Sequence, residues 1–375
     1  MLPHHTRNEI VSQTLLKGLP RQPSFSSEEA GILPHPSLIE SGIDDTLKKI
    51  AALAGERRSA VERSRDRILV RNASIDEGVC SKRIVGVDAG RNGHNLQLAF
   101  IPLYGAIAVL AENWNVVDSL SCAGASDIWT VERDPDKREN LLHMALEYHA
   151  AKKSLEAWHP DYLLFDGALV LNPRLRSYPS DSVGYREDFR FTAITALDLL
   201  HTCQEKGIPV MGFVKRTKMN RLHGLLGLPP MRDLALLNVL LGSREYVDPF
   251  LVDNPMALAL YRMAEEMEVC GERLRIYTTY IRTSPKSVYR VEIPEFCLDR
   301  IEELLSIAFL MADPDGIPYP IHEADRLSKM TGAASNIHLL ALFEKTMDLI
   351  KAGSLSPEDL DLFTPQYGDY WSLEG

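Results

Sequence analysis

The 375-residue sequence has few cysteines, no excess of positive charge and no long apolar run. Its five cysteines lie far apart and form no Cys-x-x-Cys pair, which argues against a zinc knuckle or a small disulfide framework. The net charge of -11 excludes a protein that coats nucleic acid through bulk positive charge. Any contact with a polyanion therefore requires a local basic patch.

Membrane signals are also missing from the sequence. The first 25 residues contain no apolar core of the signal-peptide type, and no later run reaches the ~18 apolar residues of a membrane helix. Together with the scattered cysteines, this predicts a soluble protein of the reducing cytoplasm with no membrane partner. The hydrophobic content of 45% is ordinary for a globular protein with a substantial core.

Composition divides the chain into three parts. Residues 1–40 contain five prolines and show no sustained period, which predicts a flexible N-terminal arm. Residues 41–355 form the main domain, and residues 356–375 are predicted to be a C-terminal tail. From Ile43 to Ile68, apolar or small residues step by four and three, as in an amphipathic helix. The other face of this helix is basic, so the helix either packs on its own domain or contacts a partner.

The segment from about 83 to 220 has the element order of an α/β fold with an RNase H-like core, in which helices flank a mixed sheet. The β-branched residues Ile84, Val85 and Val87 predict a buried strand. After it we expect an antiparallel meander at 96–103, 106–110 and 114–120, a helix at 139–158, a strand at 162–165, a helix at 188–206 and a strand at 208–214.

Beyond this core the sequence predicts helical and hairpin additions. The hairpin pairs Leu274–Ile281 with Val288–Ile293 across a Thr-Ser-Pro-Lys turn. Helices are expected near 231–242, 255–270, 297–311, 320–331 and 336–352.

Acidic residues follow two of the predicted core strands. Asp88 comes after the first strand, and Asp166 comes after the strand at 162–165. If these strands are neighbours, both carboxylates lie at the same edge of the sheet. Placing the helix at 139–158 in steps of about 100° puts Glu147 on the margin of its sheet-facing stripe. Glu147 is therefore the helical acid best placed to meet the two aspartates.

Carboxylates a few Å apart repel one another, and divalent cations with oxygen ligands, Mg²⁺ or Mn²⁺, remove that repulsion. Two such ions roughly 3.5–4 Å apart can clamp the attacking and leaving oxygens of a phosphodiester. The cluster therefore predicts two-metal phosphodiester hydrolysis without a protein nucleophile. Asp88 or Asp166 taken alone has a simpler interpretation as a turn-forming residue after a strand.

A local basic patch follows the strand that ends at Val214. Lys215, Arg216, Lys218 and Arg221 place four positive charges in seven residues at the same edge of the sheet. Lys and Arg hold a nucleic-acid backbone without reading its sequence, so the functional interpretation is contact with DNA phosphates. The alternative is a solvated loop.

His322 and Asp325 lie three residues apart near the start of a predicted C-terminal helix, hence on one face. Each is a candidate catalytic residue, either as a further metal ligand or as a proton-transfer group. The alternative for His322 is a packed or surface histidine.

Short motifs in this order resemble the NurA nuclease family, whose members have an RNase H-like core and act with the HerA motor ATPase in processing DNA ends. The resemblance runs from about 83 to 331 and rests on Val85-Gly-Val-Asp88, Glu147, Asp166-Gly167, Gly212-Phe-Val-Lys-Arg216, Tyr280-Ile-Arg282, Val288-Tyr-Arg-Val-Glu-Ile-Pro294 and Tyr319-Pro to Ala324-Asp325.

The resemblance assigns metal binding to Asp88, Glu147 and Asp166. It adds Asp325 as a candidate fourth ligand, although the family often has histidine at that position, and the choice between His322 and Asp325 stays open. The family often has Gly-Ser after its first aspartate, where this chain has Ala89-Gly90.

For the rest of the molecule the resemblance implies a NurA-like nuclease domain over 41–355, with Tyr280 and Arg282 among the DNA-binding residues. It also implies a Mn²⁺-favoured exonuclease and single-strand endonuclease, a homodimer, and docking onto a hexameric HerA-type ATPase.

Two other function classes compete with this interpretation. Kinases and ATPases of the actin and hexokinase type share the core and hold phosphate on an Asp-x-Gly hairpin, which Val87-Asp-Ala-Gly90 matches. They usually need a second phosphate hairpin and a glycine-rich adenosine motif, which Asp166-Gly167 does not convincingly supply. The third class is a non-catalytic adaptor of a DNA motor, in which the acids are structural. Metal-dependent cleavage separates the nuclease from the adaptor, and ATP turnover identifies the kinase.

Overall fold

The computed structural model describes residues 43–358, apart from residues 98, 125–126, 131, 269–273 and 286. The arm predicted at 1–40 and most of the tail predicted at 356–375 lie outside these residues. By their internal contacts, residues 1–59 form one unit and residues 60–375 another. The predicted amphipathic helix is present as α3 (Ile43–Ser64), which begins in the first unit and ends in the second.

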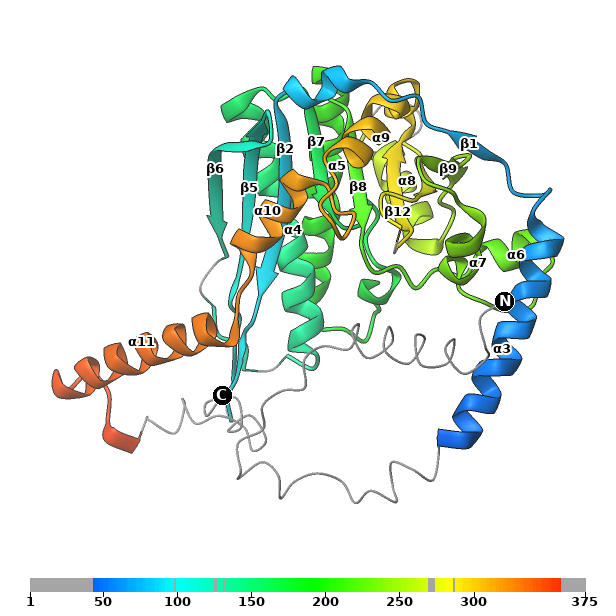
Figure 1. Cartoon of the computed structure of the whole chain (residues 1–375). Helices are drawn as coiled ribbons and strands as arrows, with labels where there is room; N and C mark the ends of the chain where they lie inside the picture. The colour runs from blue at the N-terminus through cyan, green and yellow to red at the C-terminus, as the bar shows by residue number, and fades with distance from the viewer. Residues whose placement is uncertain are drawn as a thin grey trace, which may run out of the picture. The chain divides into compact units, whose positions relative to one another are not determined.

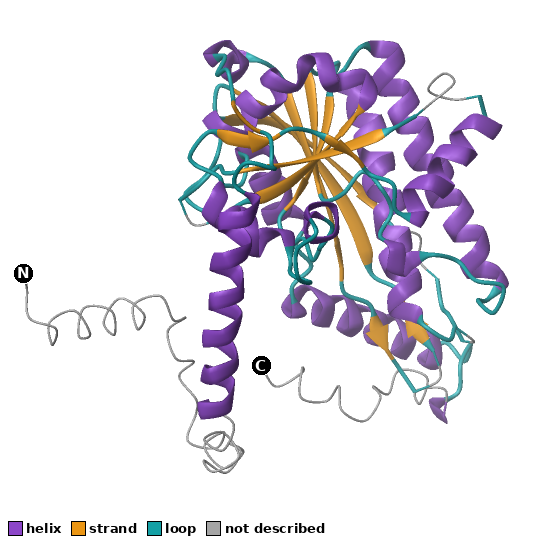
Figure 2. Cartoon of the chain, turned by 90° about the vertical axis from the view of Figure 1, so that its right-hand side faces the viewer, coloured by secondary structure: helices purple, strands orange, loops and turns teal. Residues whose placement is uncertain are grey.

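Within the described residues, the second unit is built on a mixed sheet of ten strands, whose path is β1-β9-β11-β12-β8-β7-β2-β5-β6, with β10 beside β11. Figure 2 shows how strongly the strands twist relative to one another, with helices on both sides. The strands are β1 (Val70–Asn72), β2 (Ile84–Arg91), β5 (Tyr104–Glu112), β6 (Asn115–Ala123), β7 (Tyr162–Asp166), β8 (Val210–Val214), β9 (Glu245–Val247), β10 (Phe250–Leu251), β11 (Ile276–Ile281) and β12 (Tyr289–Pro294).

β2 is the central strand of the predicted core. It pairs antiparallel with β5 and parallel with β7, while β6 extends the antiparallel side and β8 the parallel side. Parallel neighbours need long crossovers, and helices in the sequence supply them between β6 and β7 and between β7 and β8. The predicted α/β fold with an RNase H-like core is therefore confirmed.

Helices cover both faces of this sheet. The described helices after α3 are α4 (Pro135–Trp158), α5 (Val183–Lys206), α6 (Leu222–Leu226), α7 (Asp233–Leu240), α8 (Pro255–Glu266), α9 (Ile301–Leu310), α10 (Tyr319–Ser328) and α11 (Gly332–Lys351), with short 3₁₀ helices η2 (Glu77–Ser81), η3 (Pro173–Leu175) and η4 (Glu295–Arg300). In Figure 1, α10 crosses in front of β2 and β5, and α4 lies behind them.

The sequence explains the ends of α4. The Asp134 side chain accepts a hydrogen bond from the backbone N–H of Lys137, and Pro135 occupies the first turn, where its missing N–H costs nothing. At the other end His159 adopts a left-handed conformation with φ of 48° and closes the helix before Pro160. α4 is thus held at a fixed length across the sheet.

None of the described helices combines the length and the apolar character that crossing a bilayer requires.

One predicted element of the meander is wrong. The run 96–103 is not a strand of the main sheet, because β2 continues to Arg91 and pairs there directly with Tyr104. The intervening residues leave the sheet and form a small pair of strands, β3 (His94–Asn95) and β4 (Phe100–Ile101). The buried carboxylate of Glu139 accepts a hydrogen bond from the Leu103 N–H, which fixes the return of this excursion.

Candidate active site

Two acids lie beside each other on neighbouring parallel strands. In the register of β2 and β7, Val87 is opposite Phe165, so Asp88 and Asp166 occupy the next positions on the two strands. Directly paired residues of adjacent strands point to the same face. The two carboxylates therefore lie together where β7 ends, as the sequence predicted.

α10 approaches this face of β2 unusually closely, because two glycines flank Asp88. A Cβ atom at Gly86 would lie 2.1 Å from the carbonyl oxygen of Pro320, and one at Gly90 would lie 2.0 Å from that of Ser328. No larger residue fits at either position without displacement of α10. The Val-Gly-Val-Asp-Ala-Gly motif thus forms the surface against which α10 packs.

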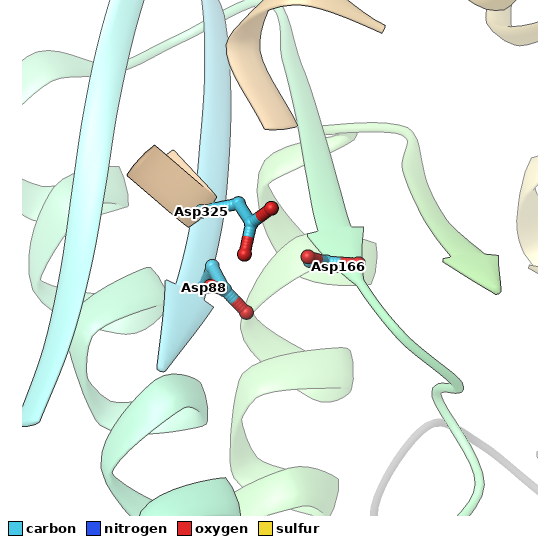
Figure 3. Close-up of side chains that lie close together, drawn as sticks. All are labelled: Asp88, Asp166 and Asp325. Atoms are coloured by element: carbon cyan, nitrogen blue, oxygen red, sulfur yellow. The ribbon is translucent and has the colours of Figure 1, made fainter. Parts of the chain in front are cut away.

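The helix held in this way contributes a third acid. Asp88, Asp166 and Asp325 each offer one carboxylate oxygen, and the three oxygens lie within 4.8 Å of one another. Figure 3 shows the three side chains converging from β2, β7 and α10. The geometry thus brings Asp325 into the cluster that the sequence predicted around Asp88 and Asp166.

Glu147 reaches the cluster from the opposite face of the sheet. Its helix, α4, packs on the face to which Phe165 points, where Tyr148 contacts that ring. The carboxyl group of Glu147 is buried, and its Oε1 has no hydrogen-bond partner among the described residues. Burial, followed by the charges of Asp88 and Asp166, raises the pKa of Glu147 well above its ordinary value. Glu147 therefore borders the cluster, although its oxygens are not among the three that converge.

Burial and crowding also perturb the aspartates. Burial raises the pKa of Asp88, and Asp325 raises it further, while a hydrogen bond from Ser328 and the charge of Lys215 oppose the shift. Burial and the charge of Asp88 raise the pKa of Asp166 to about 7. Near neutral pH Asp166 is thus protonated in a fraction of the molecules, and a bound cation would displace that proton.

Lys215, the first residue after β8, lies among the acids. Its ammonium group forms ion pairs with Asp166 and, at 3.0 Å, with Asp325. Burial alone would lower the pKa of this lysine, but the two carboxylates outweigh burial and the pKa is raised. A single positive charge cannot balance the carboxylates around it.

The donor set fits a divalent cation. It consists of carboxylate oxygens, the ligands that Mg²⁺ and Mn²⁺ prefer, drawn from three separate elements. The buried Oε1 of Glu147, for which the described part of the chain offers no hydrogen-bond partner, is a further acceptor beside them. Proximity of like charges without a cation would be destabilising, so the arrangement is suited to holding one.

A cleft of about 630 Å³ opens beside Glu147 and Asp166 on the α4 side of the sheet. Its walls come from α4, the loop after β7, the segment after β8, and β12. Three residues of the predicted basic patch line it: Arg216, Lys218 and Arg221. The fourth, Lys215, lies among the acids instead.

His322 lies one helical turn before Asp325 but outside the group of converging oxygens. Its Nδ1 lies 2.6 Å from Oδ2 of Asp313, and 46% of its side chain is exposed. The backbone N–H groups of Asp315 and Ile317 donate to the other oxygen of Asp313. The imidazole is thus held by a fixed carboxylate at the edge of the site.

Two residues predicted to bind DNA make contacts inside the fold, and for the buried Tyr280 the assignment is corrected. Tyr280 is fully buried, and its hydroxyl donates to the carboxylate of Asp233, so it cannot reach DNA. The guanidinium group of Arg282 donates to the carbonyl oxygens of Leu241 and Asn238 at the end of α7. Both residues therefore stabilise the packing of α7.

Ser328 and Arg290 are site residues that the sequence did not single out. Ser328 donates a hydrogen bond to Asp88 from 240 positions away, a relationship without any local signal. For Arg290 and Glu292 the sequence does contain a signal, because charged and uncharged residues alternate there. The structure shows that the strand carrying them is buried throughout.

The chain is similar to proteins of known family and known structure. Residues 82–330 match the family described as the NurA domain. The chain is similar to the crystal structure of the NurA nuclease from Sulfolobus solfataricus, with a TM-score of 0.60 and 17% identity, covering 83% of this chain and 97% of that one. It is also similar to a crystal structure of NurA bound to dAMP and manganese, with a TM-score of 0.53 and 12% identity, covering 78% and 94%. A comparison with curated proteins gives no match.

Proposed function

The chain belongs to the NurA family, and from this premise we propose that it is a metal-dependent deoxyribonuclease. The observation that carries the proposal is the convergence of Asp88, Asp166 and Asp325 from three separate elements. The NurA crystal structure with dAMP and manganese supports Mn²⁺ as the cofactor, with Mg²⁺ as the chemically similar alternative.

Asp88, Asp166 and Asp325 would hold the cation, and Glu147 would complete a site for two ions. A divalent cation bound there supplies Lewis acidity that polarises a phosphoryl oxygen and activates water. The hydroxyl of Ser328 holds the carboxylate of Asp88 in place. Hydrolysis of the phosphodiester bond then requires no nucleophile from the protein.

The substrate we propose is a DNA end or an unpaired DNA strand. The cleft beside the acids carries Arg216 and Lys218, whose charges would hold the sugar-phosphate backbone in any sequence. Lys215 would position the strand at the acids. His322, held by Asp313, would move a proton at the edge of the site.

The family resemblance supports a wider role in DNA end processing with a hexameric HerA-type ATPase, and a homodimer as the active unit. We propose that this work takes place in the cytoplasm, where the free thiols of Cys80, Cys122 and Cys297 would stay reduced.

The test is cleavage of end-labelled single- and double-stranded DNA by the purified full chain in Mn²⁺, Mg²⁺ or EDTA. Asp88→Ala and Glu147→Ala should abolish the metal-dependent products. Asp198→Asn is the matched control, because it removes a carboxylate whose ion pair with Lys152 lies on the outer helices. The control should cleave like the wild type.

Equal cleavage by Asp88→Ala would contradict the proposal. Absence of cleavage in every metal, repeated with a HerA-type ATPase added, would favour the adaptor, and ATP hydrolysis by the chain alone would favour the kinase-like class.

A further inference from the structure

The cleft extends away from the acids to a second polar end made by β12. Arg290 and Glu292 line this end, with Arg290 opposite Val214 of β8. β12 lies two strands from β7, whose last residue is Asp166. At about 4.8 Å between strands, the backbone of Arg290 lies roughly 10 Å from that of β7.

Two guanidinium groups that line the cleft have unused donors. Arg290 is only 9% exposed, and its Nε has no hydrogen-bond partner among the described residues, although its Nη1 donates to Glu292. Arg221 also lines the cleft and pairs with Asp253 through Nη2, while its buried Nη1 is equally unpartnered within the described chain. Buried N–H groups without an acceptor are unfavourable, so both donors require one.

Glu292 fixes the direction of Arg290. One oxygen of its carboxylate accepts from Arg290, and the other accepts from the backbone N–H of Val170 in the loop after β7, at 3.1 Å. The loop that borders Asp166 and the guanidinium of Arg290 are thus held by the same carboxylate. Arg290 is therefore positioned in advance of any ligand.

We propose that Arg290 and Arg221 form a subsite for the phosphate of a nucleotide adjacent to the scissile linkage on a single DNA strand. The inference rests on the proposed nuclease function and adds a second anion site to it. Guanidinium N–H groups match the oxygens of phosphate in geometry and charge. A cleft of about 630 Å³ accommodates one or two nucleotides but not a duplex.

The experiment measures binding rather than cleavage. A fluorescent single-stranded oligonucleotide, with one linkage at a time replaced by an uncharged methylphosphonate, is titrated with the full chain in Ca²⁺ and followed by anisotropy. In the wild-type protein, substitution at one linkage next to the cleaved position should weaken binding by about tenfold. In Arg290→Gln and Arg221→Gln, the same substitution should have no further effect.

Three controls complete the design. Arg262→Gln removes one positive charge from the exposed surface of α8 and should keep the wild-type pattern. Arg290→Gln/Glu292→Gln replaces the buried ion pair as a whole, so it tests the subsite if the single variant does not fold. Oligonucleotides with a 5′-phosphate or a 5′-hydroxyl separate a terminal phosphate from an internal one.

An unchanged methylphosphonate pattern in both arginine variants would overturn the subsite and leave Arg290 with a structural role. If the chain never cleaves DNA, but one linkage is sensitive in the wild type and insensitive in the arginine variants, the result would support the subsite while contradicting the nuclease. The two proposals therefore fail separately.

Discussion

Gly86 lies against the backbone of Pro320, with the position of a missing Cβ atom only 2.1 Å from the proline carbonyl oxygen. This contact decides how near α10 comes to β2, and hence whether Asp325 reaches the acids on the sheet. A glycine in the central strand thus sets the geometry of a side chain on a distant helix.

Gly86→Ala should therefore displace α10 and separate Asp325 from the cluster. Overpacking of this kind costs about 1–3 kcal/mol, so the melting temperature should fall and Mn²⁺ should stabilise the variant less than the wild type. Thermal unfolding with and without Mn²⁺ provides the measurement. Gly332→Ala is the control, because among the described residues its added Cβ meets nothing within 4 Å outside its chain neighbours and the nearby backbone of its own helix, and it should unfold no earlier than the wild type.

Glu147→Gln should abolish cleavage yet stabilise the metal-free protein. The pKa of Glu147 is raised by burial and by Asp88 and Asp166, so folding favours its protonated form. Wild-type stability in EDTA should therefore fall as pH rises above the ordinary glutamate value, and the variant should lose this component of the slope. Urea unfolding between pH 5 and pH 8 measures the difference. If the free energy of unfolding depends on pH equally in the wild type and the variant, Glu147 does not contribute to the slope.

Lys215→Met should lower stability in EDTA, because Asp166 and Asp325 lose the ammonium group between them. Added Mn²⁺ should restore more stability to this variant than to the wild type, since the cation replaces the missing charge. Thermal shift as a function of Mn²⁺ concentration tests this. The idea is wrong if the variant responds to Mn²⁺ less than the wild type does.

Arg216→Gln/Lys218→Gln should weaken binding to single-stranded DNA whatever its sequence. Each neutralised phosphate contact releases a counterion, so the slope of log K against log salt should become shallower by about 1 to 2. Titrations at several salt concentrations give the slope. An unaltered slope would show that these side chains, although they line the cleft, do not meet the backbone.

Tyr280→Phe should lower the free energy of unfolding and leave the affinity for DNA unchanged. The variant removes the hydroxyl that donates to buried Asp233, and an unsatisfied buried acceptor costs about 1–3 kcal/mol. Urea unfolding and DNA anisotropy on the same preparation separate the two effects. Reduced affinity at unchanged stability would restore Tyr280 as a DNA contact.

The parts of the site that sequence could predict are those with local signals. Asp88 and Asp166 each come directly after a buried apolar run within a strand, and Glu147 has a position on a helical stripe that periodicity reveals. The excursion after Arg91 was missed because a short apolar run resembles a strand whether or not it joins the sheet. For Tyr280 the error is a predicted DNA contact at a buried residue. The presence of a tyrosine in a family motif does not indicate whether its hydroxyl is exposed or buried.

Long-range relationships account for the rest. No pattern in the sequence indicates that Ser328 bonds Asp88, because that contact depends on how α10 crosses the sheet. The choice between His322 and Asp325 likewise depends on the rotation of α10. Packing against Gly86 and Gly90 helps to fix that rotation, which helical spacing alone could not decide.

The distance along the chain between Asp88 and Ser328, 240 positions, has a consequence for biosynthesis. A ribosome releases the strand that carries Asp88 long before it releases α10, so a nascent chain lacks Asp325 until most of the protein has been made. A product truncated before α10 would likewise lack Asp325, the third acid of the cluster. The order of translation thus delays the proposed nuclease activity until the surrounding fold has been made.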